Sequence, residues 1–335
     1  MAAGVMSARA RVASRRRRIL LEHLQAYLFI LPAVVLIGVF DILPGFAALG
    51  MSLTRWGIIY ERFTWFDNYR AILDPAGSRF AEFVNSLAVT VWYVLLTVPV
   101  EMAIALVVAF VLYQGTVGRG LYRTVYFMPY ITSVVAAATI FEWIFDANFG
   151  FLNFLIGLAG IGSQEWLREP DGVFEMIGSA FGLRLDGWLA GPSLSLVAVA
   201  IFTAWHFIGF QTVIFLAGLT NISREYYEAA RIDGAGDRQI FFRITLPLLS
   251  PTIFFVAIIA TVGAMRSFSQ IYVLTGGGPL DTTRNVPMLI FHTFFERTVN
   301  NGIGLGAAMS FIFVLIIIVI TLVQFRVLGR RVFYG

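Results

Sequence analysis

The chain has 335 residues, of which 59% are hydrophobic and 13% are charged, whereas a soluble domain carries about 25% charged residues. It contains neither cysteine nor lysine, and its formal net charge is only +4. This composition excludes a disulfide framework, a thiolate metal site and a standard P-loop, which needs a lysine after its glycines. If ATP drives the function, another polypeptide binds the ATP. The small net charge gives no indication of a nucleic-acid partner.

The N-terminal segment is polar and basic and is followed by an apolar stretch. Its run Arg15-Arg16-Arg17-Arg18 is compatible with a nucleic-acid patch or with the charged start of a signal peptide. The apolar stretch 27–53 has no clear small-x-small cleavage site. We therefore expect a retained first span that is preceded by a cytoplasmic basic tail, 1–26.

Apolar runs long enough to cross a hydrocarbon core of about 30 Å recur along the chain. The candidate spans are 27–53, 83–112, 125–145, 194–219, 248–274 and 303–327. The sequence therefore predicts an all-α membrane protein of about six transmembrane helices, with a transmembrane domain over 27–330.

The distribution of arginine predicts the orientation of these spans. The tail, the connections 113–124 and 220–247 and the C-terminus together hold fifteen arginines, whereas the three other connections hold eight although they are much longer. The positive-inside rule then places both termini in the cytoplasm.

On the opposite side, the sequence predicts a long extracytoplasmic loop, 146–193. Acidic side chains outnumber arginines in this loop. Such a loop is either a solvated acidic surface or a docking surface for an external partner, and the sequence leaves both interpretations open.

The inner connection 220–247 reads as two short helices that are broken at glycine. Ser223 is placed to cap the first helix, and Gly234 allows the left-handed conformation that often ends one. Asp237 stands near the start of the second helix, and Pro247 opens the next span. This amphipathic hairpin is either a surface element lying on the lipid headgroups or a docking element for a cytoplasmic partner.

The same connection carries a family motif. Glu228-Ala229-Ala230, then Gly234 after three residues, then Ile244-Thr245-Leu246-Pro247 after nine more match the fixed positions of the EAA loop. The chain thus resembles the permease subunits of binding-protein-dependent ABC importers, and it looks most like the carbohydrate-uptake subfamily of the maltose and glycerol-3-phosphate systems. Further matching segments are Phe66–Tyr69, Arg119-Gly120, Arg123-Thr124, Phe149-Gly150 with Leu152-Asn153, and Thr275–Pro279.

The resemblance covers roughly residues 25–330 and implies a specific assembly. In this family the EAA helix lies in a cleft of an ATPase subunit, two permeases (usually a heterodimer) pair around a central path, and an external binding protein delivers the sugar. By match, the coupling residues are Glu228, Ala229, Ala230 and Gly234. ATP and Mg belong to the ATPase dimer, no cofactor is expected on this chain, and the location implied is the bacterial inner membrane. The connection after Asn153 looks longer than in compact members.

Polar residues inside predicted spans are costly and tend to face the bundle interior or a water-filled cavity. Arg266 and Gln270, at spacing i, i+4, are expected on one helix face. The candidate substrate path is Trp205, Gln211, Arg266, Ser267, Gln270 and Tyr272. The alternative is interhelical bonding, such as a salt bridge between Arg266 and Glu101, and His206 is expected to be a packing residue.

Two other classes of membrane protein are alternatives to the importer. An ion-coupled secondary transporter would need intramembrane carboxylates, for which Glu101 and Asp41 are the candidates, but it has no use for an ATPase-docking helix. An intramembrane enzyme would need a nucleophile with a base or a metal cluster, and the sequence has neither HExxH nor cysteine. No catalytic or metal-binding residue is therefore predicted.

Overall fold

The computed structural model describes residues 21–114, 118–296 and 301–332, and these are helical except for one small antiparallel ribbon and the connecting loops. Within these ranges five helices are long and apolar enough to cross a membrane, and the number is six if one bent pair of helices is counted as a single span. The predicted all-α membrane protein of about six spans is confirmed. Most of the predicted basic tail, residues 1–20, lies outside the described residues.

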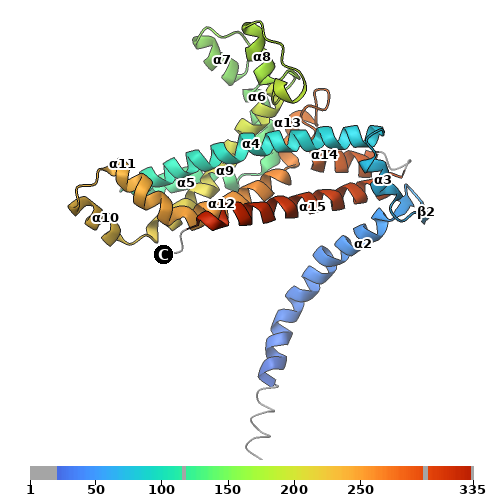
Figure 1. Cartoon of the computed structure of the whole chain (residues 1–335), viewed down its shortest axis with the longest axis horizontal. Coiled ribbons are helices and arrows are strands. Elements are labelled where there is room, and N and C mark those ends of the chain that lie inside the picture. Colours follow the sequence, from blue (N-terminus) through green and yellow to red (C-terminus); the bar gives the residue numbers. More distant parts are fainter. Residues whose placement is uncertain (1–20, 115–117, 297–300, 333–335) are drawn as a thin grey trace, which may run out of the picture.

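Four long helices form the bundle and lie side by side in Figure 1. They are α4 (Ser78–Tyr113), α9 (Leu194–Thr220), α12 (Leu246–Met265) and α15 (Gly302–Val327). Small residues allow a close approach of α4 and α9, because Ala105 and Ala109 of α4 are fully buried in a cluster with Phe215 and Leu219 of α9. Van der Waals packing of this kind is what holds helices together in lipid.

The third predicted span, 125–145, is not straight. It consists of α5 (Arg119–Ile131) and α6 (Val134–Ile144), which meet at an angle of 95°. Pro129 lies in the last turn of α5, and Thr132 and Ser133 have non-helical backbones between the two helices. Proline weakens the helix because it lacks one hydrogen-bond donor, and the bend itself lies at Thr132 and Ser133, where the backbone is not helical.

The fifth predicted span, 248–274, is also divided. The helix ends at Met265, and α13 (Ser269–Thr275) starts only after three non-helical residues. The side-chain amide of Asn285 donates to the backbone carbonyl of Ser267 at 2.6 Å, which satisfies an acceptor at the break. Arg266 and Gln270 therefore do not share one helix face, and the prediction made from their spacing is wrong.

The remaining elements lie at the two ends of the bundle and along its side (Figure 1). One end, called here the hairpin end, carries α10 (Arg224–Ile232) and α11 (Asp237–Ile240), which leads through η3 (Phe241–Thr245) into α12. The opposite ribbon end carries β1 (Thr54–Trp56), β2 (Tyr60–Phe63) and α3 (Asp67–Leu73). The other short elements are α7 (Phe151–Leu158), α8 (Val173–Ala180), η2 (Gly187–Ala190), α14 (Val286–Phe291), η4 (His292–Glu296) and η6 (Gly329–Arg331).

An asparagine pair holds the ribbon end together. Asn68 donates to the carbonyls of Ser52 and Thr54, both at 2.8 Å, and accepts from the side chain of Asn301 at 2.7 Å. These bonds join the first helix, the ribbon and the start of α15. Asn68 belongs to the matching segment Phe66–Tyr69, so that segment has a structural role here.

The first helix, Leu21–Ser52, leaves the bundle (Figure 1). It includes a widened turn, η1 (Gly38–Ile42), followed by α2 (Leu43–Ser52). None of its most apolar 18-residue window is buried in the chain. It contacts the bundle through α2, which packs on α15.

Candidate functional site

The hairpin of α10 and α11 has its turn fixed by backbone geometry. Ser223 caps α10, since its hydroxyl accepts from the backbone N–H of Glu225. The helix ends at Ile232, and Gly234 has φ +78°, a left-handed conformation that favours glycine. The backbone N–H of Ala235 then donates to the carbonyl of Ala230 at 2.9 Å. The predicted cap and the predicted glycine break are both confirmed.

Aromatic contacts tie the hairpin to the bundle. The ring of Tyr227 lies 6.3 Å from that of Tyr113, at the end of α4, and the ring of Phe241 lies 4.8 Å from that of Phe110. Burial raises the pKa of the Tyr227 phenol, which also accepts a hydrogen bond from Thr245 at 3.5 Å. Because Asp237–Met265 is one continuous helix, the second half of the hairpin is an extension of α12.

The predicted coupling residues differ in exposure, and three of the four lie on α10. Glu228, Ala229 and Gly234 are exposed, whereas Ala230 is buried against the chain itself. Ala230 therefore serves the packing of the hairpin. The exposed face includes one large apolar side chain that the motif does not single out, Ile232, with 86% of its surface accessible.

Three of the six predicted path residues are buried and three are exposed. Gln211, Ser267 and Gln270 are buried, whereas Trp205, Arg266 and Tyr272 lie on the surface of this chain. The residues described hold no salt bridge between Arg266 and Glu101. His206 packs among aromatic rings such as those of Phe202 and Tyr130, in agreement with a packing role.

A buried hydrogen-bond network joins α4, α9 and α13. The amide of Gln270 donates to the hydroxyls of Ser267 at 2.8 Å and Tyr93 at 3.0 Å, and Tyr93 shares a 2.7 Å hydrogen bond with Thr203. Tyr93 is fully buried. Sequence reasoning missed Tyr93 and Thr203, although a tyrosine in the middle of an apolar span needs a partner for its hydroxyl.

Next to this network lies a cavity of about 180 Å³ between α4, α5, α9 and α12. Of the predicted path residues, Gln211 and Ser267 line it. Glu101 also lines it, is only 3% exposed, and has Gln211 as its hydrogen-bonding neighbour. Its complete lining is Glu101, Tyr130, Thr203, Phe207, Phe210, Gln211, Ile214, Val256, Ile259, Ala260, Gly263, Ala264 and Ser267.

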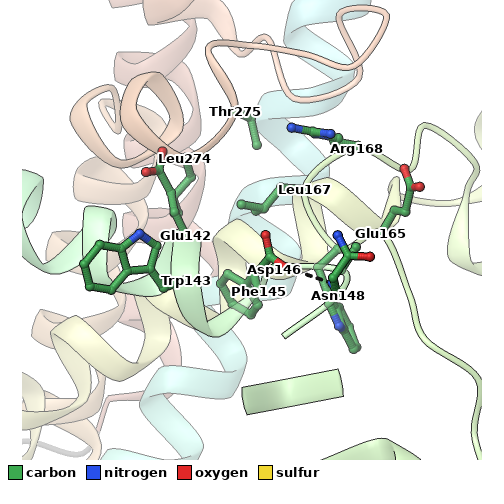
Figure 2. A pocket seen from close by; sticks show the side chains of 12 residues that line it. Glu142, Trp143, Phe145, Asp146, Asn148, Glu165, Leu167, Arg168, Leu274 and Thr275 are labelled. Atoms are coloured by element: carbon green, nitrogen blue, oxygen red, sulfur yellow. Dashed lines mark hydrogen bonds between the residues drawn. The ribbon is translucent and has the colours of Figure 1, made fainter. Parts of the chain in front are cut away.

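A second and larger cavity, of about 540 Å³, lies where α6 and the 146–193 connection meet α13. Figure 2 shows the carboxyl groups of Glu142, Asp146 and Glu165 around it, with the guanidinium of Arg168. Asn153 organises this loop, because its side chain bonds the carbonyls of Asp146 and Gln164 and accepts from the indole of Trp166 at 2.8 Å. Asn153, from the matching pair Leu152-Asn153, thus holds residues 146, 164 and 166 of the long connection together.

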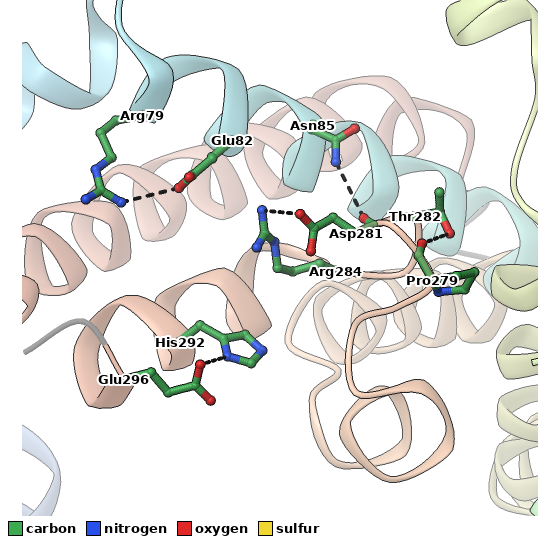
Figure 3. A network of polar contacts seen from close by, with 9 residues as sticks. All are labelled: Arg79, Glu82, Asn85, Pro279, Asp281, Thr282, Arg284, His292 and Glu296. Atoms are coloured by element: carbon green, nitrogen blue, oxygen red, sulfur yellow. Dashed lines mark hydrogen bonds and ion pairs between the residues drawn. The ribbon is translucent and has the colours of Figure 1, made fainter. Parts of the chain in front are cut away.

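A polar network follows the glycine-rich segment Thr275–Pro279 and borders α4 (Figure 3). Arg284 pairs with Asp281 at 2.9 Å, and Asn85 of α4 donates to the Asp281 carbonyl at 3.5 Å. His292 lies 2.6 Å from Glu296 one turn on. Within the described part of the chain, no group of three or more His, Asp or Glu is arranged to hold a metal ion.

Together these features define a class of protein: a multi-pass membrane protein with a largely apolar cavity that has a few polar residues inside its bundle, and with a structured hairpin at one end. Residues 68–334 match the family described as binding-protein-dependent transport system inner membrane component. The chain belongs to this family, which confirms the resemblance predicted from its motifs. Membership in this family also weighs against an ion-coupled secondary transporter.

Curated relatives are similar in sequence to this chain over most of their length. The trehalose/maltose transport system permease protein of Thermococcus litoralis is 31% identical over 90% of this chain and 92% of its own. The sn-glycerol-3-phosphate transport system permease protein of Agrobacterium fabrum is 32% identical over 92% and 96%. The lactose transport system permease protein of Rhizobium radiobacter is 31% identical over 81% and 83%.

Solved structures show the same fold. A bacterial alginate ABC transporter in complex with a periplasmic protein bound to an alginate pentasaccharide contains a similar chain. That chain has a TM-score of 0.74 and 18% identity, and the similarity covers 95% of this chain and 98% of the other. At this identity the similarity shows a shared overall fold.

Proposed function

We propose that this chain is the transmembrane permease subunit of an ATP-driven, binding-protein-dependent importer of sugars or sugar derivatives. One observation supports this most strongly: the hairpin that carries the EAA motif continues into the helix that lines the bundle cavity. The names of the relatives, which refer to maltose, trehalose, lactose and glycerol phosphate, support the cargo class. The chain itself is a transport subunit, and ATP hydrolysis belongs to a separate ATPase.

Coupling would act through the length of this helix. Asp237–Met265 has 29 residues, or about 43 Å at 1.5 Å per residue, and Val256, Ala260 and Ala264 on it line the cavity. A rigid helix that is displaced at its hairpin end must tilt or shift at the cavity. The exposed Glu228, Ala229 and Ile232 offer the surface by which an ATPase would grip α10, and Gly234 supplies the turn.

The proposed assembly also contains a second permease, an ATPase dimer that holds ATP and Mg, and an extracytoplasmic sugar-binding protein. In the proposed path, Gln211, Ser267 and Gln270 contact cargo from inside this chain. The exposed Trp205, Arg266 and Tyr272 would face a central path between the two permeases. In this arrangement Arg266 would face the path and not the lipid, where an arginine side chain is costly.

In the proposed orientation, both termini and the hairpin lie in the cytoplasm, and the chain lies in the inner membrane of a bacterium. A reporter that is active only outside the cytoplasm is expected to be active after Gly172 and silent after Gly236, because the arginine-rich connections stay inside. Measuring both fusions in intact cells checks this, and the reverse pattern would rule out the orientation and the docking role together.

The coupling role is tested by Glu228→Arg. We expect the variant to reach the membrane at near-normal levels, because Glu228 is exposed on α10, yet to lose sugar uptake through loss or uncoupling of the ATPase. The measurements are co-purification of the ATPase and uptake in cells. Arg62→Glu, an exposed charge reversal at the ribbon end, is the matched control and should behave as the unmodified protein. Normal ATPase binding and uptake in Glu228→Arg would refute the proposal.

A further inference from the structure

The cavity inside the bundle has an unusual polar corner. Glu101 is the one acidic side chain among the described residues that line the cavity, and none of them is basic. It lies twelve residues before the end of α4 at Tyr113, about 18 Å along the helix axis, and therefore deep inside the membrane. A carboxyl group at that depth is costly and points to a function.

Gln211 completes this corner and leaves an acceptor free. It is 4% exposed, and its side chain is the hydrogen-bonding neighbour of Glu101. Its carbonyl oxygen, Oε1, is buried and has no hydrogen-bond partner in the described chain. Since a buried acceptor without a donor is unfavourable, the corner is suited to a ligand that brings hydrogen-bond donors.

The rest of the lining describes the shape of such a ligand. Tyr130 and Phe210 stack with ring centroids 4.6 Å apart, and Phe207 stands beside them. Flat apolar faces of this kind suit the C–H faces of a sugar ring. The volume of about 180 Å³ equals roughly six water molecules at about 30 Å³ each, which is the scale of one ring.

An anionic cargo does not fit this corner, because its charged group lacks the hydrogen-bond donors that the corner is suited to. A carboxylate or phosphate brings acceptors and negative charge to a corner that already consists of a carboxyl group and a free amide oxygen. An ionised group buried there would also find no cationic partner, because none of the described lining residues is basic, and an unpaired buried charge is costly. Arg266 precedes Ser267 in the chain, but it is not among the residues that line this cavity.

We propose that Glu101 and Gln211 form a hydrogen-bond-accepting pair that selects uncharged, hydroxyl-rich cargo, so that this chain takes neutral sugars and excludes sugar acids and phosphates. This inference rests on the proposed function and narrows its substrate class. It distinguishes the chain from relatives whose names or structures refer to glycerol phosphate and to the acidic polysaccharide alginate.

The test uses the assembled transporter in lipid nanodiscs without its binding protein, so that the permease alone selects. The complex is incubated with neutral probes (glucose, galactose, maltose, trehalose and lactose) and with anionic probes (glucuronate, galacturonate and sn-glycerol 3-phosphate), and retained compounds are identified by mass spectrometry. We expect retention of neutral probes only. Glu101→Gln and Gln211→Leu should each weaken that binding at least tenfold, whereas Glu142→Gln, at the other cavity, should leave it unchanged.

The outcomes separate this inference from the proposed function. Retention of anionic probes as tight as that of neutral ones, or unchanged neutral-sugar affinity in both cavity variants, would overturn the role of the pair and leave a sugar permease standing. Retention of no probe of either kind would overturn this inference, whereas the proposed function would fall only if sugar uptake in cells, with the binding protein present, were also absent. Co-purification of the ATPase with each variant verifies that the complex is assembled.

Discussion

The hairpin end and the bundle cavity are built in different ways. The hairpin forms from one short stretch of sequence, with a serine cap, a left-handed glycine and a second helix that continues into α12. The cavity takes its lining from four helices that are far apart in the chain. Its network joins Tyr93 to Gln270 across 177 positions.

Because the two regions are built differently, a single substitution is expected to have different consequences in each. In the hairpin, one backbone conformation determines the direction of the chain, so a substitution acts where it is made. In the bundle, helix spacing determines the position of every lining side chain, so a substitution at a helix contact acts on the whole cavity. Substitutions of glycine and of a buried amide test this contrast.

The largest effect is expected at Gly209, where α9 meets α5. An added Cβ would lie 1.9 Å from the backbone carbonyl of Tyr126, so Gly209→Ala must push the helices apart. Overpacking of this kind costs roughly 1–3 kcal/mol. We expect a lower thermal midpoint of the purified complex and loss of cargo binding, measured together.

The matched control is Gly120→Ala on α5, where an added Cβ meets no atom within 4 Å. Its thermal midpoint should be unchanged or slightly higher, because alanine is a better helix former than glycine. Equal stability of the two variants would contradict the close approach of α5 and α9.

A smaller effect on stability, but a full loss of transport, is expected at Gly234. Its φ of +78° is left-handed, and a β-branched residue there costs about 1 kcal/mol or more. Gly234→Val should therefore insert in the membrane yet fail in uptake, because α10 no longer turns at that residue. Gly236→Ala, at φ −74° with no atom within 4 Å of the added Cβ, should transport normally. Normal uptake by Gly234→Val would show that the turn is not needed.

The smallest effect is expected at Gln270. Gln270→Ala removes the hydrogen bonds to Tyr93 and Ser267. The net contribution of one such hydrogen bond to stability is about 0.5–1.5 kcal/mol. Sugar-stimulated ATP hydrolysis should fall several-fold while the complex stays assembled. Tyr93→Phe should give a similar loss, and the double variant less than the sum, because both belong to one network. Fully additive losses would place the two residues in separate sites.

Much of this protein could be predicted from residues that act locally. Apolar runs predicted about six spans because backbone groups in lipid must satisfy one another within a helix. Ser223 and Gly234 predicted the cap and the turn of the hairpin because each acts on its own backbone. The family followed from the EAA spacing, and the match over residues 68–334 confirms it.

The errors arose where a second segment decides the conformation. The fifth span was expected to be continuous, but Asn285, from the following loop, bonds the Ser267 carbonyl at the break. Ala230, a predicted coupling residue, is buried within the chain, and its coupling role stays a prediction. Neither contact leaves a signal in the spacing of nearby residues.

The sequence by itself determined the class of protein, the number of spans and the conformation of the hairpin, because hydrophobicity, capping and left-handed glycine are properties of a few consecutive residues. Only the tertiary structure decided which polar residues meet. Tyr93, Thr203 and Gln270 come together because α4, α9 and α13 meet, and Glu101 comes to Gln211 because small side chains allow α4 and α9 to approach closely. Helix packing is a property of surfaces formed by distant segments, and no local pattern specifies which face will meet which.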